Sequence, residues 1–350
     1  MMKKNLSILL ILFLTICNAQ IEDFDSLLEK GKSEFKKKIE KQDFNKAVKV
    51  LEEAVKIRPN NTEAKYFLGY AYSRLNAKDG TNMTTLSLDL TIKSSEQFEG
   101  VIALSPKYTG EEVVLDPYAK ITAEWGSMAM SYLYRGEKEK AIWAFKEGKK
   151  RGGFSDFILS LNKNFLSTCT KRSILMTSGD LFTFPMWYLQ IVENFRKDVI
   201  VIDVNLLETI WYPNYLLKHN IIEFDVSEKV LDAFQYEEWS DKEITIDSIS
   251  WIVKPSYYDK YVLRSDLVFL SLLKANKFKK DVFFTKGFDR NRNLSLTNNL
   301  VPYGFIDKIE EESKDTELGG GQKTIDNLKK LVNKNSPDEL LLVKLLEFWL

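Results

Sequence analysis

The sequence is poor in the side chains that carry most metal and nucleophilic chemistry. Its 350 residues include one histidine, His219, and two cysteines, Cys17 and Cys169. One histidine cannot supply a multi-histidine zinc site, and it lies near a predicted helix end, where the helix dipole favours it. Cys169 precedes a predicted strand, where an inert buried thiol is the ordinary outcome. We therefore predict no catalytic residue, no metal site and no cofactor, and the composition favours a binding protein over an enzyme without deciding between them.

Long apolar runs are also missing. No segment reaches the roughly 20 apolar residues that a membrane-spanning helix needs. A shorter apolar run, residues 6–16, follows two lysines and precedes small residues at positions 17–19. This order is typical of a secretory signal peptide. We predict that residues 1–19 are a signal peptide and that the mature chain is exported, to the periplasm, the outer membrane or the medium.

The end of this segment leaves two interpretations open. Cleavage after Ala19 gives an unmodified mature chain, whereas lipoprotein processing would use residues 14–17 and acylate Cys17. Ile16 is bulkier than the residue that lipoprotein processing prefers, which favours ordinary cleavage. After that cleavage only Cys169 remains, so an intramolecular disulfide is excluded and stability must come from a packed core.

An excess of one charge is absent as well. The chain has 50 lysines and arginines against 50 aspartates and glutamates, and loss of the two lysines in the signal peptide leaves a net charge near −2. Nucleic acids and anionic membranes are bound by basic surfaces. The composition therefore indicates neither partner, and its 44% of hydrophobic residues is sufficient for one or two domains.

A repeated helical pattern occupies the N-terminal half. Ala47 is followed by Leu51, Ala54 and Pro59 at offsets of four, seven and twelve residues. This pattern resembles the second helix of a tetratricopeptide (TPR) repeat, in which small residues let two helices approach and proline ends the helix. Two further copies are marked by Leu68, Gly69 and Tyr72 and by Trp125, Ala129, Tyr132, Gly136, Ala141 and Phe145. We predict a TPR helical-hairpin domain over residues 25–155, because three repeats are about the minimum for a stable stack.

The resemblance to TPR proteins implies a concave wall built from the first helices of the repeats. It places five side chains there: Tyr66, Tyr70, Arg74, Met130 and Tyr134. Large aromatic side chains with an arginine suit an extended or helical peptide. Two insertions, residues 77–91 and 107–116, are either part of this working face or tolerated surface loops. The leading functional hypothesis is an adaptor that holds a protein or peptide partner in the cell envelope.

The pattern changes after a glycine pair at residues 152–153. Two apolar runs, residues 173–177 and 199–202, flank a helical stretch, and a third run lies at residues 281–284. A strand, a helix and a strand of these lengths predict a parallel pair. The expected fold class is thus α + α/β: the TPR array, a Rossmann-like parallel-sheet α/β domain at residues 156–309, and C-terminal helices within residues 322–350.

Two aspartates follow the first two predicted strands. Asp180 and Asp203 would both lie at the carboxyl edge of the parallel sheet, where open α/β sheets bind ligands. With Thr183 and Gln190 nearby, they would bind sugar hydroxyls or a hard cation. The alternative is that Asp180 caps the following helix and Asp203 orders its loop. The second functional hypothesis is therefore a carbohydrate- or ligand-binding module, with hydrolysis as an activity that paired carboxylates allow.

Several segments of this half resemble one family. Residues 179–190 read GDLFTFPMWYLQ and residues 206–212 read LLETIWY, with weaker likeness at residues 196–199, 264–267 and 280–284. These blocks resemble the soluble C-terminal region of protein O-mannosyltransferase-like membrane proteins of Bacteroidetes. The chain has apolar Leu181, Phe182 and Ile210 where that family has polar residues. The transferase chemistry of those proteins lies in their membrane part, so the resemblance implies no transferase activity here.

Overall fold

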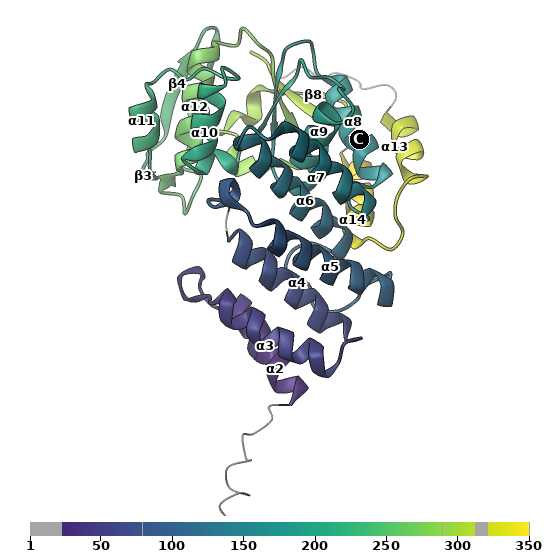
Figure 1. Cartoon of the computed structure of the whole chain (residues 1–350). Coiled ribbons are helices and arrows are strands. Elements are labelled where there is room, and N and C mark those ends of the chain that lie inside the picture. Colours follow the sequence, from purple (N-terminus) through teal and green to yellow (C-terminus); the bar gives the residue numbers. More distant parts are fainter. Residues whose placement is uncertain (1–22, 79, 289, 312–320, 350) are drawn as a thin grey trace, which may run out of the picture.

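The computed structural model describes residues 23–78, 80–288, 290–311 and 321–349. The predicted signal peptide and Cys17 lie outside these residues. Among the described helices, none combines the length and the apolar character needed to cross a bilayer. The chain forms a helical array, an α/β module and a C-terminal helical hairpin (Figure 1).

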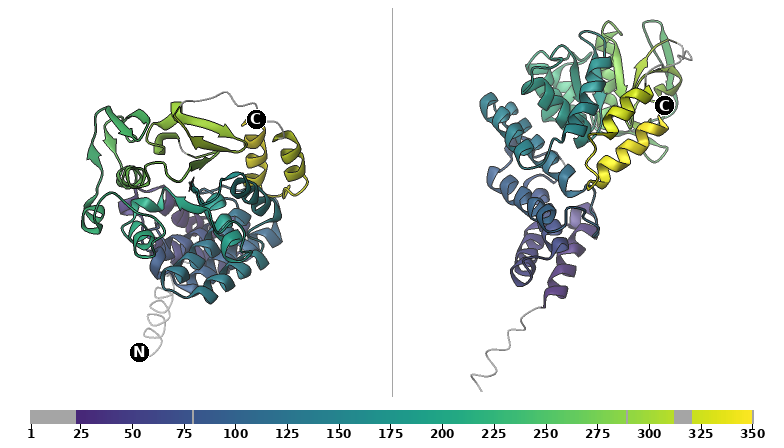
Figure 2. Two further views of the ribbon diagram at one scale, coloured as in Figure 1. Left: turned by 90° about the horizontal axis from the view of Figure 1, so that it is seen from above. Right: turned by 90° about the vertical axis from the view of Figure 1, so that its right-hand side faces the viewer.

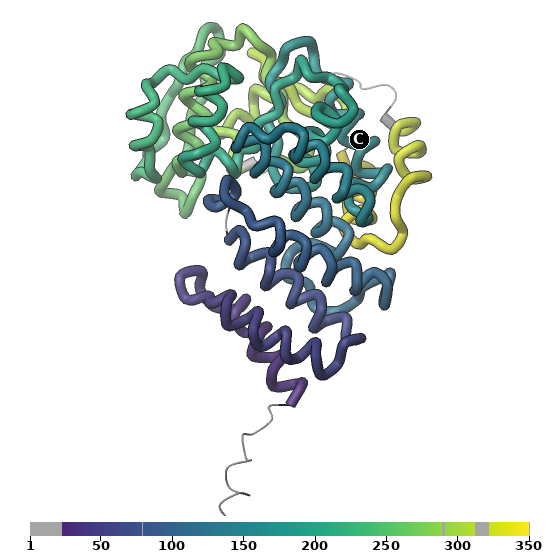
Figure 3. Tube along the Cα trace, in the orientation of Figure 1, coloured from purple at the N-terminus to yellow at the C-terminus, as the bar shows by residue number. Residues whose placement is uncertain are grey.

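The array consists of three helical hairpins stacked side by side (Figures 1 and 3). Consecutive helices pack against each other throughout the stack. The helices are α2 (Phe24–Lys36), α3 (Phe44–Ile57), α4 (Thr62–Asn76), α5 (Leu88–Leu104), α6 (Pro117–Tyr134) and α7 (Lys138–Lys150), with short 3-10 turns η1 (Ile39–Lys41) and η2 (Met83–Thr85). The predicted helical-hairpin array is confirmed.

Local sequence explains where these helices begin and how closely they pack. Asp43, Asn61 and Asp116 each accept a hydrogen bond from the backbone N–H three residues on, which satisfies a free donor at the helix start. The glycines allow close contact: a Cβ placed on Gly148 would lie 2.5 Å from the Cβ of Trp125. The insertion expected at residues 77–91 is shorter, since α5 begins at Leu88, where Ser87 caps it.

The α/β module is built on a five-stranded mixed sheet of order β2-β1-β7-β9-β8. The predicted parallel pair is confirmed, since β1 (Ile174–Thr177) pairs with β2 (Ile200–Asp203), and β7 (Val282–Thr285) joins β1 in parallel. The sheet also contains antiparallel pairs, so it is mixed rather than all parallel. Strands β8 (Leu300–Tyr303) and β9 (Ile306–Ile309) form an antiparallel hairpin whose turn holds Gly304 at a φ of 63°.

Helices and small sheets complete the module. The crossover helix α9 (Asp180–Ile191) lies between β1 and β2 in sequence, and α12 (Arg264–Asn276) precedes β7. The remaining elements are α8 (Asp156–Thr168), η3 (Leu206–Glu208), α10 (Trp211–Lys218), α11 (Glu228–Ala233), β3 (Glu237–Glu238), β4 (Lys242–Ile246), β5 (Ile249–Val253), β6 (Tyr261–Val262), η4 (Arg290–Arg292) and η5 (Leu296–Asn299). The pairs β3–β6 and β4–β5 are small antiparallel sheets.

The C-terminal helices α13 (Gly321–Lys329) and α14 (Pro337–Phe348) form a hairpin that returns to the array. Figure 2 shows them, in yellow, beside the α/β module, with one end of α14 reaching the blue helices. There the Asp116 carboxylate accepts hydrogen bonds from the Ser336 hydroxyl and from the backbone N–H of Asp338, 3.1 Å away. In return, the Asp338 carboxylate accepts the backbone N–H of Asp116 at 2.8 Å.

Candidate functional site: a polar pocket between the array and the sheet edge

The last hairpin of the array lies directly on the crossover helix of the sheet. Helix α6 packs against α9, and a Cβ placed on Gly126 would lie 2.3 Å from Cγ of Phe184. A second contact joins Tyr134 of α6 to Trp211 of α10, whose ring centroids are 5.5 Å apart. The array therefore covers the carboxyl edge of β1 and β2, where ligands of open α/β sheets bind.

A cavity of about 240 Å³ remains at this junction. Its walls come from α4, α6, the residues after α4, the segment before α6, the start of α9 and the turn after β2. The polar side chains that line it include Arg74, Lys120, Glu124, Asp180, Asp203 and Asn205. Groups from both parts of the chain thus share one cavity, which we call the junction pocket.

Asp180 is the first residue of α9 and follows Gly179, whose φ is 93°. Its side chain is half-buried, and no residue of the described chain donates a hydrogen bond to its carboxylate. Burial raises the pKa of Asp180 to about 6, the positive charge of Lys120 opposes this, and the negative charge of Asp203 adds to it. The carboxylate is therefore a free acceptor in the pocket.

Asp203 ends β2 and is fully engaged with the protein. Its Oδ1 accepts the backbone N–H groups of Asn205 at 2.8 Å and Leu206 at 3.1 Å. Its Oδ2 accepts the Thr183 hydroxyl and the backbone N–H of Gly179 at 3.3 Å. Burial raises the pKa of Asp203, and these hydrogen bonds oppose the shift. Asp203 and Thr183 thus order the turn that positions Asp180.

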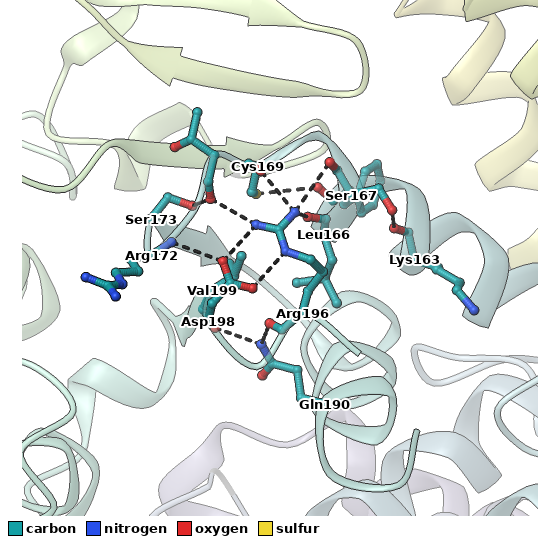
Figure 4. Close-up of polar contacts among 12 residues, drawn as sticks. Lys163, Leu166, Ser167, Cys169, Arg172, Ser173, Gln190, Arg196, Asp198 and Val199 are labelled. Atoms are coloured by element: carbon teal, nitrogen blue, oxygen red, sulfur yellow. Dashed lines mark hydrogen bonds and ion pairs between the residues drawn. The ribbon is translucent and has the colours of Figure 1, made fainter. Parts of the chain in front are cut away.

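Gln190 does not reach the pocket. Its side-chain amide lies near the far end of α9 and donates to the carbonyls of Arg196 at 2.9 Å and Val199 at 2.7 Å (Figure 4). The Arg196 guanidinium in turn donates to carbonyls at the end of α8, including Leu166 at 2.7 Å, and pairs with Asp198 at 2.8 Å. This network joins α8 and α9 to the residues that precede β2. Gln190 therefore stabilises the fold and does not contribute to the pocket.

Two charged residues of α6 complete the pocket, and the sequence interpretation missed both. The Lys120 ammonium lies 2.7 Å from the Glu124 carboxylate and 4.9 Å from the ring centroid of Tyr70. Both side chains are almost fully buried, with 11% and 6% of their surface exposed. Their spacing of four residues within an otherwise uncharged helix was the available signal, because charged groups on a packed helix face are uncommon.

The Arg74 guanidinium has N–H groups that are not used within the described chain. One guanidinium nitrogen donates to the carbonyl of Lys78 at 2.7 Å. Its other N–H groups make no hydrogen bond or ion pair to any part of the chain that the structure describes. Arg74, which lines the junction pocket together with Tyr70, therefore has donors available to a ligand.

The remaining residues expected on the concave wall are not open to a partner. Tyr66 and Tyr70 are 0% and 2% exposed, since the segment before α6 covers them. Met130 is buried, with 3% of its surface exposed. Tyr134 is 41% exposed but packs against Trp211 of the α/β module. The segment before α6 thus occupies the part of the expected groove that Tyr66 and Tyr70 form.

Cys169 and His219, for which no catalytic role was predicted, have unreactive surroundings. Burial raises the pKa of the Cys169 thiol to about 12, which keeps it protonated. His219 ends α10, and its ring lies 4.4 Å from the ring of Tyr215. Neither residue lines the junction pocket.

Comparison with known proteins gives one family match. Residues 158–221 match the family model described as TMEM260-associated domain 2. No curated protein matches the chain. The matched residues run from α8 to the end of α10 and include Asp180, Thr183 and Asp203. They also contain the two blocks whose resemblance to O-mannosyltransferase-like proteins is clearest. The chain is therefore similar to this domain over the βαβ unit that forms one wall of the junction pocket.

Proposed function

We propose that the protein binds a small polar ligand of the polyhydroxylated class, to which sugars belong, in the junction pocket. The observation that carries this proposal is the half-buried Asp180 carboxylate, which has no hydrogen-bond partner in the described chain and shares a cavity with Arg74. A ligand pocket combines a cavity with a few convergent polar groups, and here a free acceptor and free donors line the same cavity, so a ligand that both donates and accepts hydrogen bonds would fit it.

The charges of the pocket favour a neutral ligand. Arg74, Lys78 and Lys120 contribute three positive groups, and Glu124, Asp180 and Asp203 contribute three carboxyl groups. A phosphate site would have a clear positive excess. Sugar hydroxyls both donate to carboxylates and accept from guanidinium groups. Similarity to a domain associated with an O-mannosyltransferase-like protein supports the same ligand class.

Calorimetric titration with mannose, glucose and N-acetylglucosamine tests this proposal. We expect at least one of them to bind the mature chain, and Asp180→Asn to weaken binding by about tenfold, since a hydrogen bond to a charged group contributes about 1.5 to 3 kcal/mol. The control is Asp241→Asn, at an exposed position before β4. Equal binding by the Asp180 variant, or no binding of any sugar, would reject the proposal.

A second function is favoured by a separate observation. The array already holds a non-helical segment of its own chain through the Tyr66 and Tyr70 hydroxyls. We propose that the array is a TPR-type adaptor that holds a protein partner in the cell envelope. Affinity capture from an envelope extract tests this with the mature chain and a Tyr66→Phe, Tyr70→Phe variant. Identical captures would contradict it.

We also propose that the chain is exported. The basis is the N-terminal sequence alone: two lysines, an apolar run and small residues. N-terminal analysis of the protein from its native host should find Gln20 as the first residue. A diacylated Cys17 at the N-terminus would instead identify a lipoprotein, and an uncleaved chain in the cytoplasm would reject export.

A further inference from the structure

A second cavity lies at the carboxyl end of β7, the strand next to β1 in the sheet. Its volume is about 380 Å³, within the range of about 300 to 1,000 Å³ that is usual for small-molecule sites. Strands β1, β2 and β7 are parallel, so their carboxyl ends share one edge of the sheet, where open α/β sheets bind ligands. Its lining residues differ from those of the junction pocket. We call this cavity the β7 pocket.

Two buried oxygen atoms beside this pocket have no partner. Thr285 ends β7 and Asn293 follows η4, and both residues line the pocket. They are 1% and 2% exposed. Thr285 Oγ1 and Asn293 Oδ1 make no hydrogen bond within the part of the chain that the structure describes. Buried polar atoms are nearly always hydrogen-bonded, so two such atoms along one cavity point to a bound molecule.

Aromatic rings form much of the remaining wall. The rings of Phe284 and Phe288 pack edge to face, with centroids 4.9 Å apart. Trp349, which follows α14, lies against the turn after β7: a Cβ placed on Gly287 would lie 3.0 Å from Cη2 of Trp349. The C-terminal hairpin thus supplies one wall of the pocket. Flat apolar walls of this kind suit a ring that packs against them.

The charges of the pocket indicate a neutral ligand. Lys286 forms an ion pair with Asp307, and the other described residues that line the pocket are uncharged. A charged ligand would have no unpaired group of opposite charge there, and its loss of water would be uncompensated. Asn293 Oδ1 needs a hydrogen-bond donor, whereas the Thr285 hydroxyl can donate or accept.

We propose that the β7 pocket binds a small neutral aromatic molecule that carries an O–H or N–H donor, as phenols and aromatic amides do. The ring packs against Phe288 and Trp349, and the donor bonds to Asn293 or Thr285. This site is separate from the junction pocket, and its ligand belongs to a different chemical class from the sugar proposed there. Because Trp349 contacts the ligand, binding also stabilises the docked C-terminal hairpin.

The test uses phenol, benzamide and 4-hydroxybenzamide as probes. The fluorescence of Trp349 is obtained as the difference between the mature chain and its Trp349→Phe variant, and at least one probe should change it in a saturable manner. Asn293→Leu and Thr285→Val should each weaken that binding by about three- to tenfold, as expected for loss of a hydrogen bond. Thr245→Val, at an exposed position on β4, is the matched control and should bind as the natural chain does.

The junction pocket is tested apart from this site. Asp180→Asn should leave probe binding unchanged, and mannose should not compete with the probe. If sugar binding fails while the probe binds, only the proposed sugar site is rejected. If mannose displaces the probe, the β7 pocket is not a separate site and the present proposal is rejected.

The stability of Thr285→Val separates a ligand site from a structural one. Valine has the shape of threonine without the unpaired hydroxyl, so this variant should be at least as stable as the natural chain in urea. A second measurement remains if Asn293→Leu does not fold: the probe should slow hydrogen exchange of α14 in the natural chain and leave α2 unchanged. Absence of binding by all three probes, or equal binding by the Thr285 and Asn293 variants, overturns the proposal.

Discussion

Asp180 and Asp203 each follow a parallel strand, yet their carboxylates have different surroundings. Asp203 accepts four hydrogen bonds, two from the turn after β2 and two from residues at the start of α9, whereas Asp180 accepts none from the described chain. The sequence placed both at the sheet edge but could not separate their roles, because both positions have the same local pattern. The difference arises from Thr183, which turns its hydroxyl toward Asp203.

Replacing Asp203 should destabilise the fold. We expect Asp203→Ala to lower the free energy of unfolding by about 2 to 4 kcal/mol, since buried backbone N–H groups lose their acceptor. Urea unfolding followed by tryptophan fluorescence measures this. Asp241→Ala, at an exposed position, should change the same quantity by less than about 0.5 kcal/mol. Equal effects of the two substitutions would show that the Asp203 network is unimportant for stability.

Asp180→Asn should raise the free energy of unfolding, in contrast to Asp203→Ala. The pKa of Asp180 is about 6 in the folded chain, above the ordinary value of 3.8, so ionisation of this group opposes folding as pH rises through 6. The variant should therefore be more stable than the natural chain at about pH 7.5, and this difference should shrink at about pH 5, where Asp180 is protonated. Urea unfolding at both pH values measures it; a pH-independent difference would contradict the assigned pKa.

At the scale of elements, the C-terminal hairpin is joined to the array by a pair of aspartates. Burial raises the pKa of Asp338 to about 6, and the nearby charge of Asp116 adds to this. Glu112 and Glu339 also face this contact, and burial raises the pKa of each. The sequence predicted the two helices but not their contact with α6, since residues 116 and 338 are far apart in the chain.

This contact should weaken as pH rises. The pKa of Asp338 exceeds its ordinary value in the docked hairpin, so docking is stabilised below about pH 6 and loses that contribution above it. Hydrogen exchange of α14, corrected for the intrinsic rate, should be faster at about pH 7.5 than at about pH 5. Asp338→Asn should reduce this dependence. Equal protection at both pH values would show that ionisation of Asp338 has no effect on docking.

At the scale of the whole molecule, the array and the sheet meet at a glycine. Gly126 lets α6 lie against Phe184 of α9, and this contact sets one wall of the junction pocket. The pocket lies between the helical array and the sheet. Its geometry therefore depends on how closely these two parts approach each other. A small change in this interface should therefore affect ligand binding from outside the binding residues.

Gly126→Ala should separate the two parts. We expect it to lower the free energy of unfolding by about 1 to 3 kcal/mol, as is usual for overpacking, and to weaken sugar binding. The matched control is Gly100→Ala on α5, where the added Cβ meets only the flexible side chain of Lys65 at 3.3 Å. The control should be neutral or stabilising because alanine favours helix. If both variants behave alike in unfolding and titration, the interface does not set the pocket.

The sequence by itself determined the hairpins of the array, the parallel strand pair and the position of both aspartates at strand ends. These features follow from periodicity, caps and turns within a few residues of each other. Only the tertiary structure decided that Lys120 and Glu124 share a pocket with Asp180, and that the insertion covers Tyr66 and Tyr70. These contacts depend on how the array docks on the sheet edge, and residues so far apart in the chain leave no local pattern from which to predict their contact.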